Sequence, residues 1–206
     1  MNNKYFPVNK FISSVESPET IVVADRIRAL ERRGKKIIKL QTGEPDLKTH
    51  KEIIKALEIS ISKGETHYVD SRGLPELREA ISNWLKERYQ TSVDSEKNVL
   101  ITAGGVQAIF LTLTSILNPS DEVILLEPYY PQYANIVKLL GGIVRPIPVI
   151  FYKSSYRINY KVLKKTINRK TRALIINSPN NPSGKIFSSE EVESIVKIMD
   201  GKRMYI

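Results

Sequence analysis

Two prolines lie within the polar stretch Asn177 to Gly184, which directly follows the apolar run Ala173 to Ile176. Such an apolar run is typical of a buried strand. Proline cannot donate a backbone hydrogen bond to a sheet, and Asn, Ser and Gly favour tight turns, so the strand has to end in a stiff polar loop. Ser188 to Glu191 then has the composition of a helix start. The unit of strand, loop and helix predicts an open α/β sheet, which binds ligands beyond the carboxyl ends of its strands.

The rest of the chain repeats this alternation of strands and helices. It predicts an α/β fold with a mainly parallel sheet and flanking helices. Apolar periodicity predicts helices over residues 12–30, 51–62, 74–89, 106–117, 130–140, 160–167 and 188–199. Short apolar runs predict strands over 37–40, 98–102, 122–126, 143–150 and 173–176, with a further strand starting at 203–206.

The polar loop resembles a known family signature. Asn177 to Gly184 is similar to the Asn-Pro-x-Asn-Pro-Thr-Gly motif of class I/II pyridoxal-phosphate aminotransferases, with Ser183 in the usual Thr position. Four further segments resemble blocks of that family, in family order: residues 40–46, 67–78, 101–108 and 121–133. The resemblance implies the N-terminal part of the large domain of fold type I transferases, in a truncated form. It assigns 1–44 to an N-terminal arm and small-domain segment, and 45–206 to the large cofactor-binding domain.

Three parts of the family pattern are not found in this sequence. They are the aspartate that pairs with the pyridine nitrogen, the lysine that binds the cofactor covalently, and the late arginine that holds the substrate carboxylate. We therefore expect the first half of an aminotransferase, inactive alone, with a separate C-terminal half as its partner. An incomplete sheet would also leave an open edge and an open apolar face.

The resemblance assigns the cofactor phosphate to Gly104, Gly105 and Val106. A helix N-terminus presents free N–H groups and a partial positive charge, and glycine lets an anion approach the backbone. Val106 stands where the family often has Ser, Thr or Lys, so one side-chain contact to the phosphate is missing.

The resemblance assigns the cofactor ring to Tyr130 and Asn181. Tyr130 resembles the aromatic residue that stacks on the pyridine, with Tyr129 and Tyr133 as neighbouring rivals. Asn181 resembles the residue that hydrogen-bonds the phenolic oxygen. A loop-capping role is the alternative for an asparagine here, and it suits Asn177 or Asn180 better.

Two further residues are matched to the family's substrate site and dimer interface. Tyr68 resembles the tyrosine that reaches the cofactor phosphate of a second subunit, which implies a homodimer in the complete protein. Gly43, within the turn 42–46, resembles the glycine beside the substrate carboxylate. Arg72 and Arg78 could hold an anion, although the helical position of Arg78 beside two glutamates favours a structural role.

The resemblance implies pyridoxal 5'-phosphate as the cofactor and amino-group transfer between an amino acid and a 2-oxo acid, in amino acid metabolism and biosynthesis. The residues present would position the cofactor, whereas the proton chemistry needs the lysine and aspartate that are not found. Related lyases share these motifs, so neither the reaction subtype nor the amino acid substrate follows from the sequence. A non-catalytic binding or regulatory remnant is the alternative.

The formal net charge of +10 raises a further alternative. Between Phe151 and Arg172 the basic residues are Lys153, Arg157, Lys161, Lys164, Lys165, Arg169, Lys170 and Arg172, with no acid among them. Three interleaved tyrosines would suit a nucleic-acid-binding protein on a decayed enzyme scaffold. A solvated helix face explains the same charges, so nucleic acid is not the partner that we expect.

Composition also suggests a compartment. The chain has no cysteine, which suits a reducing environment, and its N-terminus lacks the apolar core of a signal peptide. Nothing approaches the length of a membrane span, and the two histidines do not have metal-ligand spacing. We therefore expect a cytoplasmic protein with no membrane partner and no metal site.

Overall fold

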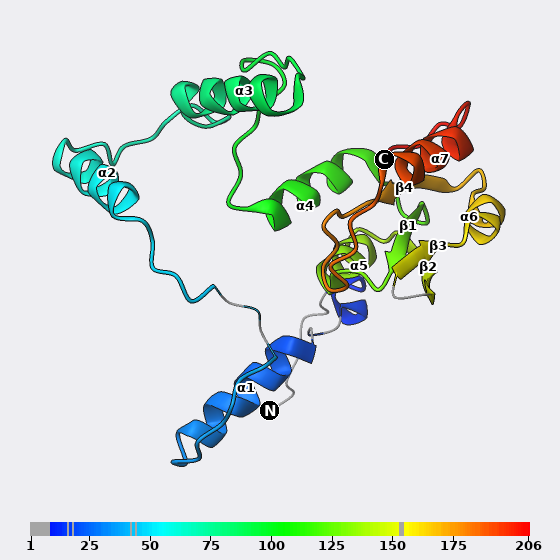
Figure 1. Ribbon diagram of the computed structural model, residues 1–206, viewed down its shortest axis with the longest axis horizontal. Coiled ribbons are helices and arrows are strands. Elements are labelled where there is room, and N and C mark those ends of the chain that lie inside the picture. The colour runs from blue at the N-terminus through cyan, green and yellow to red at the C-terminus, as the bar shows by residue number, and fades with distance from the viewer. Residues whose placement is uncertain (1–8, 16, 18, 42, 44, 153–154) are drawn as a thin grey trace, which may run out of the picture. The chain divides into compact units, whose positions relative to one another are not determined.

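The computed structural model of the chain describes residues 9–15, 17, 19–41, 43, 45–152 and 155–206 (Figure 1). Contacts between Cα atoms group the chain into two compact units. Unit 1 comprises residues 1–35 and 108–206, and unit 2 comprises residues 36–107. The predicted domain boundary between residues 44 and 45 refers to the complete family fold and stays a prediction.

Unit 1 is built on a four-stranded sheet with the strand order β3-β2-β1-β4. Its strands are β1 (Glu122–Glu127), β2 (Ile143–Tyr152), β3 (Ser155–Ile158) and β4 (Thr171–Ile175). β1 runs parallel to both β2 and β4, whereas β3 is antiparallel to β2. Tyr205 extends the parallel arrangement through a single bridge to Ala173. The predicted mainly parallel α/β sheet is therefore confirmed.

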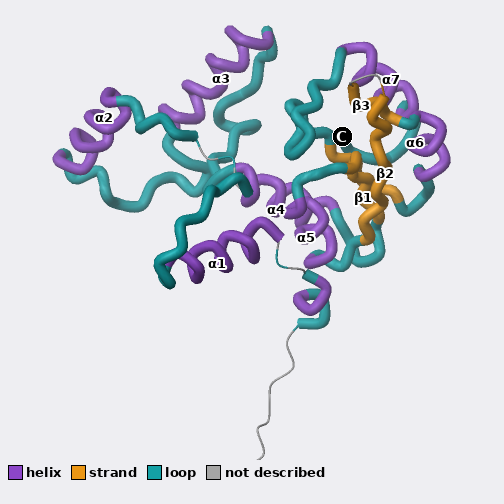
Figure 2. Tube along the Cα trace, turned by 60° about the horizontal axis from the view of Figure 1, so that its bottom comes forward, coloured by secondary structure: helices purple, strands orange, loops and turns teal. Residues whose placement is uncertain are grey.

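Helices cover both faces of this sheet (Figure 2). The helical elements of unit 1 are η1 (Ile12–Ser14), α1 (Glu19–Glu31), α4 (Gly105–Ile116, from Ala108 onward), α5 (Pro131–Leu139), α6 (Tyr160–Thr166) and α7 (Ser189–Met199). On one face, Ile124 and Leu126 of β1 pack with Leu163 of α6 and Ile195 of α7. On the other face, side chains of α4 and α5 pack against Val123 and Leu125. The alternation of β1 side chains thus supplies both cores, as expected of a central strand.

Local sequence sets where several of these helices begin. Ser188 and Glu191 form a capping box at α7, in which each side chain accepts a hydrogen bond from the other residue's backbone N–H. The Asn159 side chain accepts from the Val162 N–H at the start of α6. Pro131 occupies the first turn of α5, where its missing N–H costs nothing.

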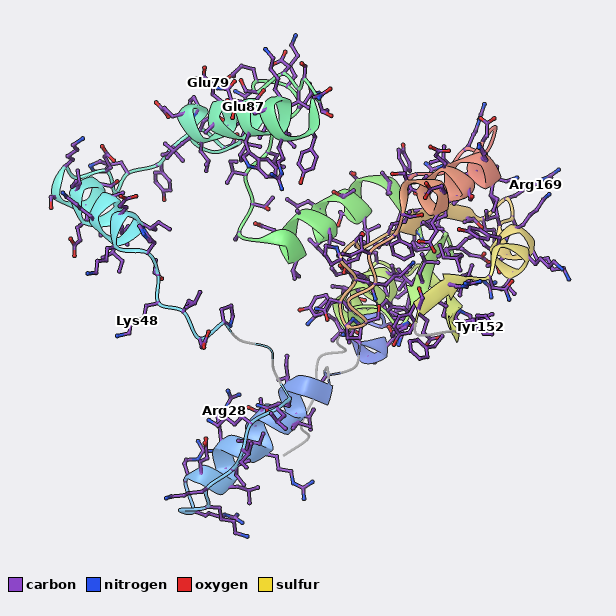
Figure 3. The ribbon with its side chains drawn as sticks, in the orientation of Figure 1. Arg28, Lys48, Glu79, Glu87, Tyr152 and Arg169 are labelled. Carbon is purple, nitrogen blue, oxygen red and sulfur yellow. The ribbon has the colours of Figure 1, made fainter. Side chains whose placement is uncertain are left out.

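The described residues of unit 2 include α2 (Lys51–Ser62), α3 (Pro75–Tyr89) and the first turn of α4, joined by loops. Figure 3 labels Lys48 in the segment before α2, and Glu79 and Glu87 on α3. The turn into α3 requires Gly73, whose φ is +99° and where an added Cβ would lie 2.3 Å from Ile101 Cγ1. Across the described residues, no helix combines the length and apolar content that a membrane span needs.

Some predicted elements are wrong. Residues 37–40 and 98–102 form no strand, and no strand within the described part of the chain pairs with them; Ile38 and Leu40 are almost fully exposed. The predicted helix over 12–30 is instead the short helix η1 followed by α1, with residues 16 and 18 outside the described part. β3 was not predicted, because its four residues gain their strand character from pairing with β2.

A buried carboxylate joins three segments of unit 1 at the amino end of β1. Glu122 is 2% exposed, and its carboxylate accepts from Arg145 Nη2 of β2 at 2.6 Å and from Asn168 Nδ2 at 2.8 Å. The hydrogen bond from Arg145 is the largest of the effects that lower the pKa of Glu122, opposed by desolvation. The charge is therefore held in the folded state by donors from β2 and from the loop before β4.

We expect Glu122→Gln to lower the free energy of unfolding by about 1–3 kcal/mol, because the neutral amide loses its charge-assisted bond to Arg145. The folded-state pKa of Glu122 lies below its unfolded value, so its stabilisation is complete above the unfolded pKa and is lost as pH falls through the folded pKa. Urea unfolding between about pH 7 and pH 3 measures this loss in the unmodified chain.

The matched control is Glu193→Gln on α7, whose carboxylate is exposed and lies 3.8 Å from Lys197 Nζ. It should change the free energy of unfolding by less than about 0.5 kcal/mol. An equal pH dependence in the Glu122→Gln variant and in the unmodified chain would contradict the assignment.

Candidate functional site

The polar loop at the carboxyl end of β4 is held by its own backbone and side chains. The Asn181 N–H donates to Asn177 Oδ1 at 2.8 Å, and the Gly184 N–H donates to the Asn180 carbonyl at 2.8 Å. Gly184 has a φ of +68°, which glycine adopts without steric cost. At the base of the loop, Lys185 Nζ contacts both Glu191 carboxylate oxygens, at 2.9 and 2.7 Å. The loop is therefore anchored to the first turn of α7.

A single side chain joins this loop to the segment after β1. Asn180 Nδ2 donates to the Pro128 carbonyl at 3.0 Å and to Ser183 Oγ at 2.7 Å. β1 and β4 are parallel neighbours, so their carboxyl ends reach the same edge of the sheet. The Asn180 bond therefore places the loop that carries Asn181 beside the segment that leads to Tyr130.

The three asparagines of the loop differ in their contacts. Asn177 and Asn180 use their side chains within the loop and toward Pro128. Asn181 is exposed, and no hydrogen bond among the described residues uses its side chain. Loop capping thus falls to Asn177 and Asn180, which leaves the Asn181 amide open to a ligand. Its assignment to the phenolic oxygen stays a prediction.

The three tyrosines after β1 also differ. Tyr133 is buried in the core, and this burial raises its pKa. Tyr130 is half-buried at the N-cap of α5, with its ring edge-on to Tyr133 at a centroid distance of 5.6 Å. Tyr129 packs against the same core. Tyr133 is thus less suited to stacking on a ligand than Tyr130, whose role stays a prediction.

The proposed phosphate turn belongs to unit 2, where α4 begins at Gly105. Gly104 has a φ of +82°, and its N–H and carbonyl both bond to Thr102, at 2.8 and 3.1 Å. Gln107 Oε1 accepts from the Ala103 N–H. A Cβ added at Gly104 or Gly105 would meet nothing within 4 Å, so space is open beside this backbone. The first-turn N–H groups of α4, including that of Val106, have no partner within the helix.

Tyr68 and Gly43 lie in exposed segments of unit 2. Tyr68 is fully exposed, and with Thr66 and His67 it lines a wide hollow. Gly43 is also exposed, while Thr42 and Glu44 of the predicted turn lie outside the described residues. Their roles at a second subunit and at the substrate stay predictions.

The two arginines considered as anion clamps already have partners. Arg78 is 1% exposed; its Nη1 lies 3.2 Å from a Glu96 carboxylate oxygen, and its guanidinium donates to the carbonyls of Gly73 and Ser95. Arg72 bonds to Asp70, and this contact lowers the pKa of Asp70 to about 2. Both arginines therefore organise unit 2.

Sequence reasoning missed two features of the loop. The Pro128 carbonyl carries no sequence signal, because any residue supplies a backbone oxygen. Lys185 and Glu191 are six residues apart across a loop and a helix start, a spacing that no helical or strand rule pairs.

Comparison with known proteins places the chain in a family. Residues 35–206 match the family aminotransferase class I and II. The chain is 38% identical to (5-formylfuran-3-yl)methyl phosphate transaminase of Methanocaldococcus jannaschii, covering 90% of this chain and 48% of the relative. It is 34% identical to an aspartate aminotransferase of Sulfurisphaera tokodaii, covering 97% and 51%.

Solved structures agree with these sequence matches. Aspartate aminotransferase from Thermus thermophilus with maleate has a TM-score of 0.88 at 30% identity, covering 95% of this chain and 50% of that one. The aspartate aminotransferase of Thermotoga maritima has a TM-score of 0.89 at 32% identity, covering 97% and 52%. These neighbours share the fold type I architecture.

The chain belongs to the aminotransferase class I and II family. It spans about half the length of the curated relatives it matches. Aminotransferases of this family depend on pyridoxal 5'-phosphate, so the cofactor prediction is confirmed for the family. Two features fit that cofactor: the open backbone at Gly104 and Gly105 suits a phosphate, and the exposed Asn181 amide suits a ring oxygen.

The loop predicts different outcomes for two adjacent asparagines. We expect Asn180→Ala to destabilise the loop by about 1–3 kcal/mol, because the Pro128 carbonyl and Ser183 hydroxyl lose their donor. Amide hydrogen exchange at Asn180 and Gly184 should accelerate accordingly. Asn181→Ala is the matched control and should change this exchange by less than about 0.5 kcal/mol. Equal acceleration in both variants would contradict the division of roles.

Proposed function

We propose that this chain supplies part of the pyridoxal 5'-phosphate site of an aminotransferase that moves an amino group from an amino acid to a 2-oxo acid. The observation that carries the proposal is the hydrogen bond from Asn180 to the Pro128 carbonyl. It holds the loop with Asn181 and the segment with Tyr130 side by side at the carboxyl edge of a parallel sheet, where ligands bind in this class of fold. The family membership supports the same function.

Each residue has a distinct task in this proposal. The backbone N–H groups of Gly105 and Val106 hold the phosphate, with Gly104 keeping the approach open. Tyr130 stacks on the pyridine and limits its tilt. The Asn181 amide donates to the phenolic oxygen and so orients the ring.

Two further residues complete the proposal. Gly43 lies beside the substrate carboxylate, and Tyr68 reaches the cofactor phosphate of a second subunit, so the complete protein is a homodimer. When bound, pyridoxal phosphate supplies an electron sink for the carbon that loses its proton. The residues of this chain bind and orient; the covalent lysine and the aspartate at the ring nitrogen match no residue of this sequence. We expect the 206-residue chain by itself to be inactive.

This chain by itself should hold the cofactor only weakly. Without a covalent link, pyridoxal phosphate should be removed by dialysis, and borohydride reduction with peptide mapping should show scattered, substoichiometric labelling of surface lysines. Amino-group transfer assayed on the same sample should be absent. Stoichiometric labelling of one lysine together with transfer to a 2-oxo acid would show instead that the chain is a complete catalyst.

Pairing this chain with a complementary part of a related enzyme should restore activity. We expect co-expression with the part of the Thermotoga maritima enzyme that this chain does not cover to restore pyridoxal-phosphate-dependent transamination. In that complex, Tyr130→Ala and Asn181→Ala should each weaken cofactor retention about 2- to 10-fold, which corresponds to about 0.5–1.5 kcal/mol. Tyr68→Phe should weaken retention through the lost phosphate contact.

Matched controls are Tyr156→Ala on β3 and Asn118→Ala in the loop before β1, which should retain the cofactor as the unmodified complex does. A complex that assembles and binds pyridoxal phosphate without turnover would favour the alternative of a non-catalytic binding or regulatory protein. If Tyr130→Ala, Asn181→Ala and Tyr68→Phe all retain the cofactor as the unmodified complex does, the site assignment is wrong.

A further inference from the structure

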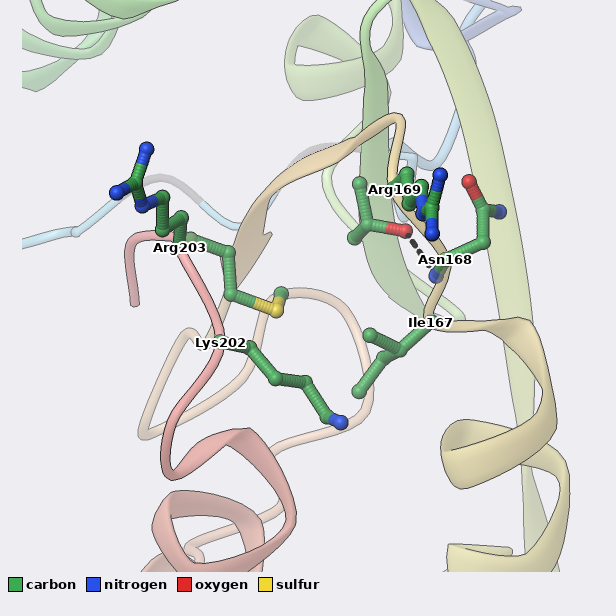
Figure 4. A pocket seen from close by; sticks show the side chains of 7 residues that line it. Ile167, Asn168, Arg169, Lys202 and Arg203 are labelled. Atoms are coloured by element: carbon green, nitrogen blue, oxygen red, sulfur yellow. Dashed lines mark hydrogen bonds between the residues drawn. The ribbon is translucent and has the colours of Figure 1, made fainter.

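A cavity lies in unit 1 at the amino end of β4, opposite the polar loop. It has a volume of about 410 Å³ and is lined by Ile167, Asn168, Arg169, Thr171, Lys202, Arg203 and Met204 (Figure 4). Residues 167–171 lead into the amino end of β4, and residues 202–204 lead into Tyr205, which runs parallel to it. β4 has five residues and so extends for about 16 Å. The length of β4 therefore separates this cavity from the loop with Asn181.

The lining of the cavity is cationic. Arg169, Lys202 and Arg203 are exposed, and no carboxylate belongs to the lining. None of the three forms an ion pair with a carboxylate among the described residues. In Figure 4 the Lys202 side chain extends across the hollow toward Ile167, whereas Arg203 points away from it and stands at the rim. An uncompensated positive field in a concave site attracts multiply charged anions.

Hydrogen bonds within the protein fix the walls of the cavity. Thr171 Oγ1 accepts from the Asn168 N–H at 2.9 Å, and Asn168 Oδ1 accepts from the Lys170 N–H at 2.8 Å. Asn168 Nδ2 also donates to Glu122 Oε2 at 2.8 Å. On the other wall, the Lys202 N–H donates to the Met199 carbonyl at 3.0 Å. A pre-formed site of this kind binds without first ordering its own loops.

Part of the lining is apolar. Ile167 and Met204 are half-buried and pack against the core cluster beneath α6 and α7. The nearby carboxylate of Glu122 is already bonded to Arg145 and Asn168, so its charge is matched. The cavity therefore combines cationic groups with an apolar floor, at a volume typical of small-molecule sites.

The remaining basic residues favour a small ligand over a nucleic acid. Arg172 donates to the Ile116 carbonyl at 3.0 Å and lies over the Tyr205 ring. Tyr160 packs against the core, and this burial raises its pKa, so its ring forms no exposed stacking platform. Figure 3 shows Tyr152 at the β2–β3 hairpin and Arg169 beside α6. Arg172 and Tyr160 of the basic run are thus engaged within the fold and are not displayed for a nucleic acid.

We propose that this cavity binds an organic polyphosphate of nucleotide size, with its phosphates at Arg169 and Lys202 and its apolar part against Ile167 and Met204. Arginine and lysine make charge-assisted hydrogen bonds to phosphate oxygens, and Arg203 at the rim adds to the local positive field. This ligand site is separate from Asn181 and Tyr130, which lie at the carboxyl edge of the same sheet.

The test is calorimetric titration of the chain with ATP at about 0.15 M salt, a concentration that screens exposed surface charge, together with an amide NMR map. ATP should shift the amide signals of residues 167–171 and 202–204. Arg169→Gln with Lys202→Gln should weaken ATP binding at least about tenfold, because two charge-assisted contacts are lost. Arg33→Gln with Lys55→Gln removes the same charge from exposed positions elsewhere and should weaken binding less than about twofold.

Additional probes decide the chemical class. Lys202→Arg should keep binding within about twofold of the unmodified chain, because the positive charge is retained. Tripolyphosphate should bind more weakly than ATP, since it lacks a part that can contact Ile167 and Met204. Equal affinities for ATP and tripolyphosphate would contradict the proposal that an apolar part of the ligand contacts Ile167 and Met204.

Two other results would overturn the site itself. Equal weakening in both double variants would show a general charge effect rather than a pocket. Tight binding of a single-stranded RNA that the Arg169 and Lys202 variants leave unchanged, with no ATP binding, would show a nucleic-acid surface instead. Circular dichroism confirms that each variant is folded, and pyridoxal phosphate retention in the restored complex should be unaffected by Arg169→Gln with Lys202→Gln.

Discussion

The burial of β1 between two parallel neighbours is the constraint on which the rest of unit 1 depends. Residues 122–126 are all buried, because alternate side chains enter the core of α6 and α7 and the core of α4 and α5. Because β2 and β4 pair with both sides of β1, the backbone of β1 is free for other contacts only at its two ends. Its carboxyl end therefore continues into Pro128 and Tyr130 beside the loop that follows β4, and the Asn180 side chain closes that contact.

The same strand gives the sheet two chemically different edges. At the carboxyl edge, prolines and asparagines form a polar loop in which Asn177 and Asn180 hold the backbone and Asn181 is exposed. At the amino edge, the buried Glu122 carboxylate accepts hydrogen bonds from Arg145 and Asn168, and Arg169 in the loop before β4 is exposed. Parallel strands make this polarity possible, because all their amino ends lie on one side. Asn181 and Tyr130 thus lie at the opposite edge of this sheet from the proposed polyphosphate cavity.

Sequence patterns located most elements of the fold because those elements are stabilised locally. α2 occupies the predicted residues 51–62, and the ends of α3, α5 and α7 lie within a residue of the prediction, since caps and prolines define them. The strands predicted at 37–40 and 98–102 are absent because a strand exists only where a partner completes its ladder. β3 was missed for the converse reason: its pairing with β2 creates it.

The sequence by itself determined the family, the parallel α/β class and the chemical types available for a cofactor site, because these depend on motifs that are contiguous in the chain. The tertiary structure decided which of several neighbouring residues of one type are buried or hydrogen-bonded and which stay exposed. Asn177 and Asn180 hold the loop while the Asn181 amide stays exposed, and Tyr133 enters the core while Tyr130 stays half-buried. Residues next to each other in sequence differ in burial and in hydrogen-bond partners. Strands and helices that are distant in the chain determine the burial and supply the partners.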